Sequence, residues 1–287
     1  MKHKIFYFLL IALAVLLITV GIWAKVAIIG IPKPLGPHNY EYNKEEMHVS
    51  YDGIDLYGMA IIPESKTEKK FPTVIFAHGA ESDYKADMTT LESLAASGIA
   101  CYTFDFYGWT SRSTGPKGTH WFKNIPRRVD DSYEIKVLQQ VDDLNAVIKA
   151  VRNFDFVDTT NIFLLGSSMG GATVAAAAIS HSKDVNGIIL QYPAINLVPT
   201  AMIQGGAYDV NKYEGDVLLL QGDNDNIVPL EMSDKLSEYY NQLRKDHSEY
   251  IVYKGQPHVF RGKYKVLAAK DMYDFITKRI VHKKVNY

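Results

Sequence analysis

Short apolar runs alternate with longer amphipathic stretches along most of this chain, and this alternation restricts the fold more than any other feature of the sequence. The runs contain few polar residues, which is typical of strands buried on both faces of a parallel sheet. Parallel strands need crossover connections, which are usually helices. The predicted strands are residues 73–79, 99–106, 161–167, 187–193, 216–223 and 249–255.

The segments between these runs repeat their apolar residues at helical spacing. The clearest helix is predicted over residues 130–153, and residues 232–243 and 264–280 repeat its pattern. Ahead of the strands, residues 47–63 predict a hairpin with Asp52 and Gly53 at its turn. The sequence therefore predicts a single α/β domain with a doubly wound, mostly parallel sheet.

The N-terminus contains a long apolar segment, Ile5 to Ala24, with no charged residue. As a helix it would extend roughly 30 Å, the thickness of a hydrocarbon core. Lys2 and Lys4 precede it and favour a cytoplasmic N-terminus. We expect an uncleaved transmembrane anchor; a cleaved signal peptide is the alternative, although residues 22–24 fit a cleavage site badly. A buried core helix is disfavoured because the segment is apolar all round.

Charge and cysteine content exclude several classes of function. The formal net charge is −1 and the pI is near 6.8, so the basic excess of a nucleic-acid-binding protein is absent. Cys101 is the only cysteine, which rules out an intrachain disulfide and a cysteine metal cluster. The sequence contains no H-E-x-x-H motif or other ligand cluster, so we expect neither a metal nor a cofactor.

Residues 166–170 read Gly-Ser-Ser-Met-Gly, which matches G-x-S-x-G only with Ser168 at the centre. The match follows a predicted strand and precedes an alanine-rich helical stretch, the context of a nucleophile elbow. A serine in such a tight turn needs small neighbours two positions before and after it. The alternative interpretation is a glycine-rich turn with no chemical role.

Two further polar sites follow later strands. Asp223 and Asp225 come after the strand at 216–223, and His258 comes after the strand at 249–255. Taken singly, each aspartate is an ordinary turn former and the histidine an ordinary surface residue. Because the carboxyl ends of parallel strands meet at one edge of the sheet, we expect these residues and Ser168 to share a crevice.

These motifs, with the His78-Gly79 pair and the "PHVF" run at 257–260, resemble the α/β-hydrolases, most closely the serine esterases and related acyl hydrolases. The resemblance covers residues 46 to 280 and implies that Ser168 is the nucleophile and His258 its base. It assigns the triad acid to Asp225, with Asp223 as the fallback. The backbone N–H groups of Met169 and Ala80 are expected to form the oxyanion hole. The implied fold is of the α/β-hydrolase type with a minimal cap, preceded by one transmembrane helix.

The sequence departs from the family pattern at three places. Many relatives contain D-x-R-G-x-G-x-S after the third strand, whereas here Tyr107 replaces the arginine and Thr110 the second glycine. Glu81 and Asp83 follow the expected oxyanion residue and predict an acidic site that discourages anionic acyl groups. The cap segment, 193–215, is too short for a deep lipid tunnel. The loop 107–129, with Trp109, Trp121 and Phe122, either covers part of the site or packs into the core.

These observations predict a serine hydrolase that cleaves an acyl ester through an acyl-enzyme intermediate. Peptidase or thioesterase activity on the same triad and a non-catalytic, membrane-tethered binding module are the alternatives. The expected organisation is a cytoplasmic stub and anchor (1–25), a linker (26–45) and a catalytic domain (46–287). The expected partners are a small-molecule or peptide acyl substrate and the membrane, with no nucleic acid. The expected location is the cell membrane, with the catalytic domain outside the cytoplasm.

Overall fold

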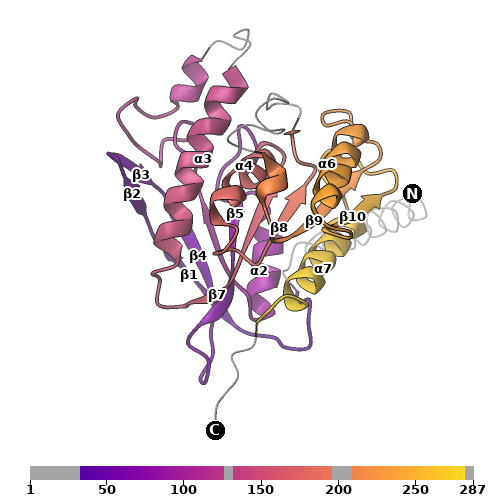
Figure 1. Cartoon of the computed structure of the whole chain (residues 1–287). Coiled ribbons are helices and arrows are strands. Elements are labelled where there is room, and N and C mark those ends of the chain that lie inside the picture. The colour runs from indigo at the N-terminus through magenta and orange to yellow at the C-terminus, as the bar shows by residue number, and fades with distance from the viewer. Residues whose placement is uncertain (1–32, 126–131, 196–208, 282–287) are drawn as a thin grey trace, which may run out of the picture. The chain divides into compact units, whose positions relative to one another are not determined.

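The computed structural model describes residues 33–125, 132–195 and 209–281. The chain divides into two units, Met1–Lys33 and Pro34–Tyr287, and the second unit is described here (Figure 1). The expected membrane segment, Ile5 to Ala24, lies outside the described residues. Within the ranges that are described, no helix combines the length and the apolar character needed to cross a membrane.

Eight strands form one sheet in the order β1-β4-β6-β5-β7-β8-β9-β10 (Figure 1). Strand β4 pairs antiparallel with β1 and β6, and all other pairs are parallel. The mostly parallel sheet predicted from the apolar runs is therefore confirmed. The strands are β1 (Tyr42–Glu46), β4 (Gly58–Pro63), β5 (Phe71–Ala77), β6 (Ala100–Phe104), β7 (Val157–Ser167), β8 (Gly187–Gln191), β9 (Asp216–Gly222) and β10 (Ser248–Tyr253).

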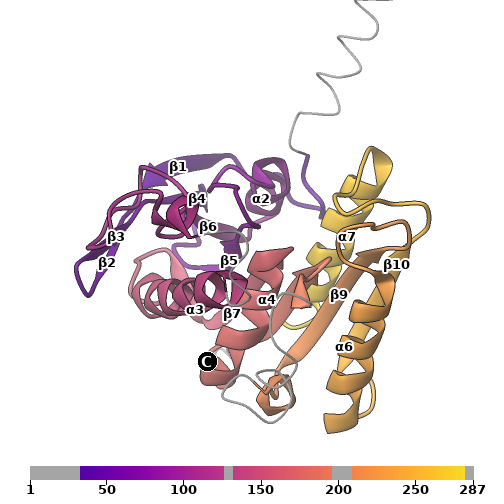
Figure 2. The ribbon, with the colours of Figure 1, turned by 90° about the horizontal axis from the view of Figure 1, so that it is seen from above.

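Helices cover both faces of this sheet (Figure 2). One face packs against α3 (Ser132–Val151), α4 (Met169–Ala178) and α6 (Leu230–Leu243). The other packs against α2 (Met88–Ala96) and α7 (Lys263–Thr277). Short 3₁₀ turns occur at Trp121–Asn124, Ile179–His181 and Val210–Lys212. The predicted helices at 130–153, 232–243 and 264–280 correspond to α3, α6 and α7.

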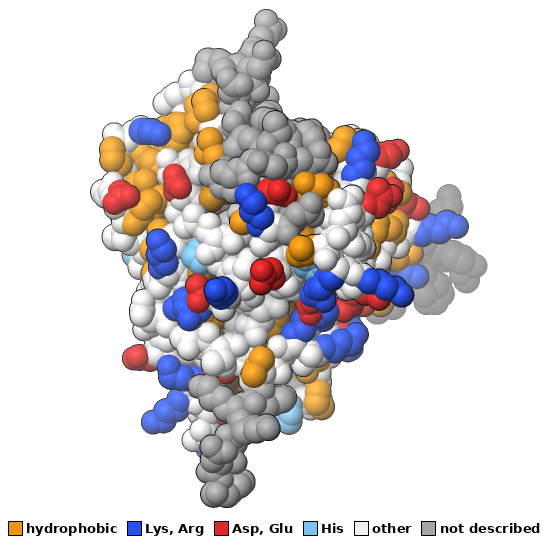
Figure 3. Space-filling view, in the orientation of Figure 1, with side chains coloured by type: hydrophobic (Ala, Val, Ile, Leu, Met, Phe, Trp, Pro, Cys, Tyr) orange, Lys and Arg blue, Asp and Glu red, His pale blue; other side chains and the backbone are white. Residues whose placement is uncertain are grey.

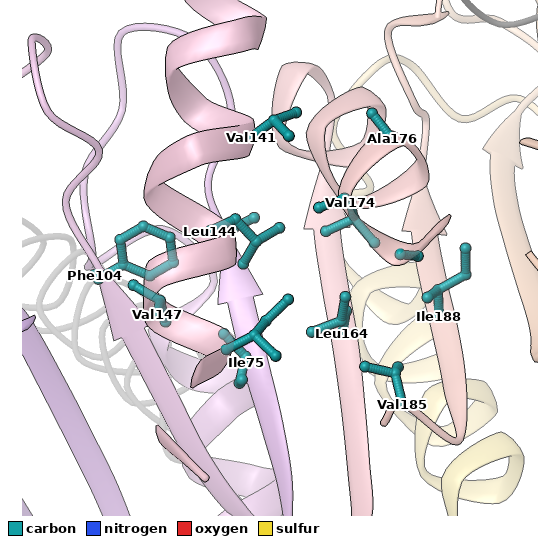
Figure 4. Packing of buried hydrophobic residues seen from close by; sticks show 14 of the residues in the cluster. Ile75, Phe104, Val141, Leu144, Val147, Leu164, Val174, Ala176, Val185 and Ile188 are labelled. Atoms are coloured by element: carbon teal, nitrogen blue, oxygen red, sulfur yellow. The ribbon is translucent and has the colours of Figure 1, made fainter. Parts of the chain in front are cut away.

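The strand residues alternate between two buried clusters because successive side chains point to opposite faces of a sheet. Ile75, Leu164 and Ile188 pack under α3 and α4 (Figure 4). Their neighbours in sequence, such as Leu165 and Ile189, are buried with α2 and α7 on the other face. Burial on both faces explains why the strands read as continuous apolar runs.

The predicted hairpin over 47–63 forms in its first part only. Strands β2 (Val49–Tyr51) and β3 (Ile54–Leu56) pair antiparallel, and both turn residues, Asp52 and Gly53, have positive φ. Residues 58–63 instead leave the hairpin as β4 and join the main sheet. Strand β1, Tyr42–Glu46, lies mostly within the segment expected to be a linker (26–45).

The order of the central strands creates a switch point between β5 and β7. The chain passes from β5 outward to β6 and then returns to the other side of β5 as β7. Ala77 at the end of β5 pairs in register with Gly166 near the end of β7. The loops after these two strands therefore lie side by side, at the place where open α/β sheets bind ligands.

On the face drawn in Figure 3, the Lys and Arg side chains of the described residues are interspersed with Asp and Glu. This mixture of signs agrees with the nearly neutral net charge. A surface of this kind does not steer ligands of one charge by a large electrostatic field.

Candidate active site

Ser168 occupies a strained turn between β7 and α4. Its φ is 55° and its ψ is −118°, a combination that is rare for a residue with a side chain. The flanking glycines are required sterically: a Cβ on Gly166 would lie 2.4 Å from the Gly170 carbonyl oxygen, and a Cβ on Gly170 would lie 2.1 Å from the Ala77 carbonyl oxygen. The close approach of β5, β7 and α4 thus explains the small residues on both sides of the serine.

The side chains of Ser168, His258 and Asp225 form a continuous hydrogen-bonded series. His258 Nε2 lies 2.9 Å from Ser168 Oγ, and His258 Nδ1 lies 2.8 Å from Asp225 Oδ2. A carboxylate can only accept, so Nδ1–H donates to Asp225 and Nε2 accepts from the serine hydroxyl. The structure therefore brings together the three residues expected to form a triad, and their catalytic roles remain predictions.

The Asp225 carboxylate is fully buried and accepts several hydrogen bonds. Its Oδ1 accepts from the backbone N–H groups of Ile227 and Val228, and its Oδ2 accepts from Gln221 Nε2 as well as from His258. These donors compensate a buried charge that would otherwise be costly. Asp223, the fallback acid, is exposed and accepts from the Gly255 N–H instead.

Ser167 does not share this arrangement. Its hydroxyl lies 3.1 Å from Gln191 Oε1 and 3.5 Å from Asp87 Oδ2. Of the two adjacent serines, only Ser168 has a histidine within hydrogen-bonding distance.

The two expected oxyanion donors lie on neighbouring segments. Met169 begins α4 immediately after Ser168, and Ala80 follows Gly79, where a Cβ would lie 3.3 Å from Ser168 Cβ. Neither N–H donates a hydrogen bond to another described residue. Both residues thus lie near Ser168, and each has a backbone N–H that is not used in another hydrogen bond among the described residues, as an oxyanion hole requires.

Two residues near the site, Gln221 and Tyr192, were not identified from the sequence, and a third, His78, was noted only as part of a motif. Gln221 orients Asp225 and itself accepts from Ser233 Oγ at 2.8 Å. The Tyr192 ring contacts the His258 ring at a tilt of 55°, with 4.8 Å between ring centroids. His78 bridges two loops: its Nδ1 donates to the Gly79 carbonyl at 2.7 Å, and its Nε2 accepts from the Phe106 N–H at 3.2 Å. Burial lowers the pKa of His78, which keeps the ring neutral.

A sequence pattern could have identified Gln221 as a residue near the site. Gln221 and Gln191 are polar residues at the ends of otherwise apolar strands, a position that borders the crevice. The ring contact of Tyr192 could not be read from the sequence because it depends on the direction of a loop. Tyr192 also has a positive φ, of 37°.

The expected acidic environment after Ala80 is corrected in one respect. Asp83 Oδ2 lies 2.8 Å from Arg112 Nη2, so its charge is compensated by an ion pair. Asp83 therefore no longer supports the prediction that the site discourages anionic acyl groups, which now depends on Glu81 alone. In the described residues, no group of three or more histidine, cysteine or acidic side chains is placed to hold a metal ion.

The aromatic residues of the 107–129 loop pack into the core. Trp109, Trp121 and Phe122 are buried, with Trp121 and Phe122 at 4.4 Å between ring centroids. Of the two interpretations of this loop, the structure favours packing for these three side chains. Residues 126–129 lie outside the described part of the chain.

Comparisons with known proteins relate this chain to several hydrolases. The family described as "Serine aminopeptidase, S33" matches residues 68–205. The quorum-quenching protein AidA of Acinetobacter baumannii (strain MDR-ZJ06) is 27% identical over 169 residues, which cover 55% of this chain and 50% of AidA. The match thus spans half the length of that relative.

Solved structures of several hydrolases share the fold. Est1E from Butyrivibrio proteoclasticus has a TM-score of 0.63 at 21% identity, covering 81% of this chain and 98% of Est1E. Dipeptidyl peptidase 4 of Porphyromonas gingivalis has a TM-score of 0.62 at 18% identity, covering 84% of this chain and 36% of the peptidase. An esterase and a peptidase resemble this chain equally well, so the fold does not select between their substrates.

Proposed function

The chain belongs to the α/β-hydrolase superfamily, and on that premise we propose that it is a serine hydrolase of carboxylic esters. The observation that carries the proposal is the hydrogen-bonded series from Ser168 through His258 to the buried Asp225. A serine hydroxyl is a weak nucleophile unless a base is positioned to take its proton. His258 Nε2 is placed for that transfer, and the Nδ1–H bond to Asp225 favours the required tautomer.

The proposed reaction has two stages. In the first, Ser168 Oγ forms a bond to the acyl carbon while its proton passes to His258 Nε2; the bond to the leaving alcohol then breaks, and the alcohol takes that proton. In the second, water forms a bond to the acyl carbon and gives a proton to His258 Nε2; the bond between the acyl carbon and Ser168 Oγ then breaks, Oγ takes that proton, and the carboxylic acid is released. The N–H groups of Met169 and Ala80 would stabilise the oxyanion in both stages.

A peptidase or thioesterase would use the same residues, and the aminopeptidase description of the matching family favours the first of these alternatives. Esters, thioesters and amides differ in the leaving group, and the triad geometry does not select among them. A panel of fluorogenic acyl esters, acyl thioesters and aminoacyl amides therefore decides among them. We expect the largest kcat/KM for an ester.

The nucleophile is tested by a fluorophosphonate probe on the full chain. We expect the wild type and Ser167→Ala to be labelled and Ser168→Ala to remain unlabelled, because only Ser168 has a base within reach. Ser167→Ala is the matched control, since it removes the neighbouring hydroxyl from the same turn. Labelling of Ser168→Ala would place the nucleophile elsewhere. A wild type that neither reacts with the probe nor turns over any substrate would support the non-catalytic binding module.

A further inference from the structure

The proposed oxyanion donor Ala80 lies on a loop, residues 78–87, that contains no strand or helix. An oxyanion donor is effective only if its position is fixed before the reaction begins. The loop must therefore be held by contacts with other elements, and most of these contacts lead to the segment that follows β6.

Asp105, directly after β6, is the centre of these contacts. Its side chain is fully buried. Oδ1 accepts from the Tyr84 N–H at 2.8 Å, while Oδ2 accepts from Thr110 Oγ1 at 2.7 Å and from Arg112 Nε at 2.6 Å. The Tyr84 carbonyl is held as well, by Thr103 Oγ1 at 2.9 Å. One end of the loop is thus tied through both backbone groups of Tyr84.

Arg112 adds a second connection to the same loop. While Nε contacts Asp105, Nη2 contacts Asp83 Oδ2 at 2.8 Å, so one guanidinium bridges two carboxylates. Its Cζ also lies 5.1 Å from the centroid of the Tyr84 ring. A planar guanidinium suits this geometry, because its donors point in fixed directions and its face stacks on aromatic rings.

We infer that Arg112 is a positioning residue that fixes the loop of Ala80 for oxyanion stabilisation. This inference rests on the proposed function. In the D-x-R-G-x-G-x-S pattern the arginine falls at position 107, which is Tyr107 here, so the guanidinium of this segment comes from Arg112 instead. Arg112 acts on this loop through its contacts with Asp83, with the Tyr84 ring and with Asp105, which accepts from the Tyr84 N–H.

Two other roles for Arg112, a structural role and a substrate contact, predict different effects of its substitution on stability, kcat and KM. A purely structural arginine would lower thermal stability and the fraction of active molecules, but leave kcat per active site unchanged. An arginine that contacts the substrate would change KM, since 35% of its side chain is exposed. A positioning residue lowers kcat per active site with little change in KM, because the ground-state complex does not depend on the oxyanion donors.

The test uses the full chain with Arg112→Gln, Arg112→Lys, Asp83→Asn and the double variant Arg112→Gln/Asp83→Asn. Active sites are titrated with a fluorophosphonate, and kcat and KM are measured with a fluorogenic ester. Arg244→Gln is the matched control: Arg244 also contacts an aspartate, Asp216, but at the opposite end of the sheet.

We expect Arg112→Gln to lower kcat per active site about tenfold or more, because small displacements of catalytic groups have large effects on rate. KM should change less than about twofold, because the ground-state complex does not depend on the oxyanion donors.

Asp83→Asn should also lower kcat per active site, and the double variant should be no slower than Arg112→Gln because the two residues act through one contact. Arg112→Lys should be intermediate, since an ammonium pairs with one carboxylate and does not bridge two. Hydrogen exchange in residues 78–87 should rise in Arg112→Gln and not in Arg244→Gln.

The outcomes separate this inference from the proposed function. An active wild type whose Arg112→Gln variant keeps its kcat per active site, or changes only in KM, overturns the role of Arg112 alone. A wild type that is inert toward both probe and ester overturns the proposed function and the catalytic role of Arg112 with it.

Discussion

At the residue scale, the two aspartates after β9 have opposite surroundings. Asp225 is buried and bonded to His258, whereas Asp223 is exposed and bonded to the Gly255 N–H. An asparagine at 225 loses the negative charge and can present an NH₂ group to the ring, which disfavours the tautomer that accepts from Ser168. We expect Asp225→Asn to lower kcat by about 10³- to 10⁴-fold, and Asp223→Asn to change it less than about threefold, in line with an exposed surface substitution.

Ester hydrolysis measured side by side on the two variants checks this ranking. The reverse order would move the acid to Asp223. Small, equal losses would remove the acid from the mechanism altogether. Circular dichroism of both proteins serves as the control for folding.

The register of the serine and the identity of the acid and base could be proposed from the sequence because short motifs fix local geometry. The partners of those residues could not. Gln221 and Tyr192 act through side-chain directions at strand ends, and these directions depend on which loop packs against which strand. The bridging of two aspartates by Arg112 joins residues that are 29 positions apart, so no local pattern reveals it.

At the element scale, the packing of α4 against β5 gives a prediction with two opposing effects. Glycine inside a helix costs about 1 kcal/mol relative to alanine, so Gly170→Ala would stabilise an isolated helix. In this structure the new Cβ would lie 2.1 Å from the Ala77 carbonyl oxygen and 2.5 Å from that of His78. Backbone at that distance must move, and we expect a net loss of about 2 kcal/mol or more in the free energy of unfolding.

Urea denaturation of Gly170→Ala and Gly171→Ala measures which effect is larger. The second variant is a matched control in the same helix, where the nearest atom to the new Cβ is at 2.9 Å. It should be destabilised less. If Gly170→Ala were more stable than the wild type, the close contact between α4 and β5 would be wrong.

Helix α3 carries a buried carboxyl group that links it to two other elements. Asp143 accepts from the Tyr51 hydroxyl of β2 and from the Tyr107 N–H after β6. Burial raises the pKa of Asp143 to about 7, although these hydrogen bonds oppose the shift. Between about pH 4 and pH 7 the folded protein thus binds a proton that the unfolded chain has lost, and stability falls as the pH rises, by up to about 4 kcal/mol.

We expect the unfolding free energy of the wild type minus that of Asp143→Asn to fall between about pH 4 and pH 7 and to level off above pH 7, because the variant lacks this titration. Asp155→Asn, at an exposed aspartate, is the control and should run parallel to the wild type. Parallel curves for the wild type and Asp143→Asn would contradict the raised pKa. The measurement is urea denaturation at several pH values.

The elements themselves were largely predictable, since burial on both faces of a parallel sheet leaves a plain apolar pattern. The errors occurred at the antiparallel edge. Strand β1 has mostly exposed side chains and reads as linker, and β4 follows the hairpin without a turn signal strong enough to separate them. Edge strands are specified by their backbone pairing more than by apolar residues, and sequence patterns detect them poorly.

At the scale of the whole molecule, the apolar segment at 5–24 predicts attachment to a membrane. We propose that it holds the catalytic domain on the outer side of the cytoplasmic membrane, with Lys2 and Lys4 inside. The full chain should sediment with membranes, and protease added to intact cells should remove the C-terminal domain. A chain lacking residues 1–25 is the control and should be found in the soluble fraction.

Each contrary result has a distinct meaning. A domain that is protected in intact cells and cleaved after lysis would face the cytoplasm. A mature protein in the medium that begins after Ala24 would identify a cleaved signal peptide.

All six strands from β5 to β10 run in one direction, so Ser168, Asp225, His258 and Ala80 gather at a single rim of the sheet. The other rim holds features such as the contacts of Asp216 with Arg244 and Arg279. This polarity offers a practical division to anyone who wishes to engineer the protein. Random libraries confined to exposed side chains of the first rim would sample new substrates, and a solid support or a fluorescent tag attached at the second would leave substrate entry open.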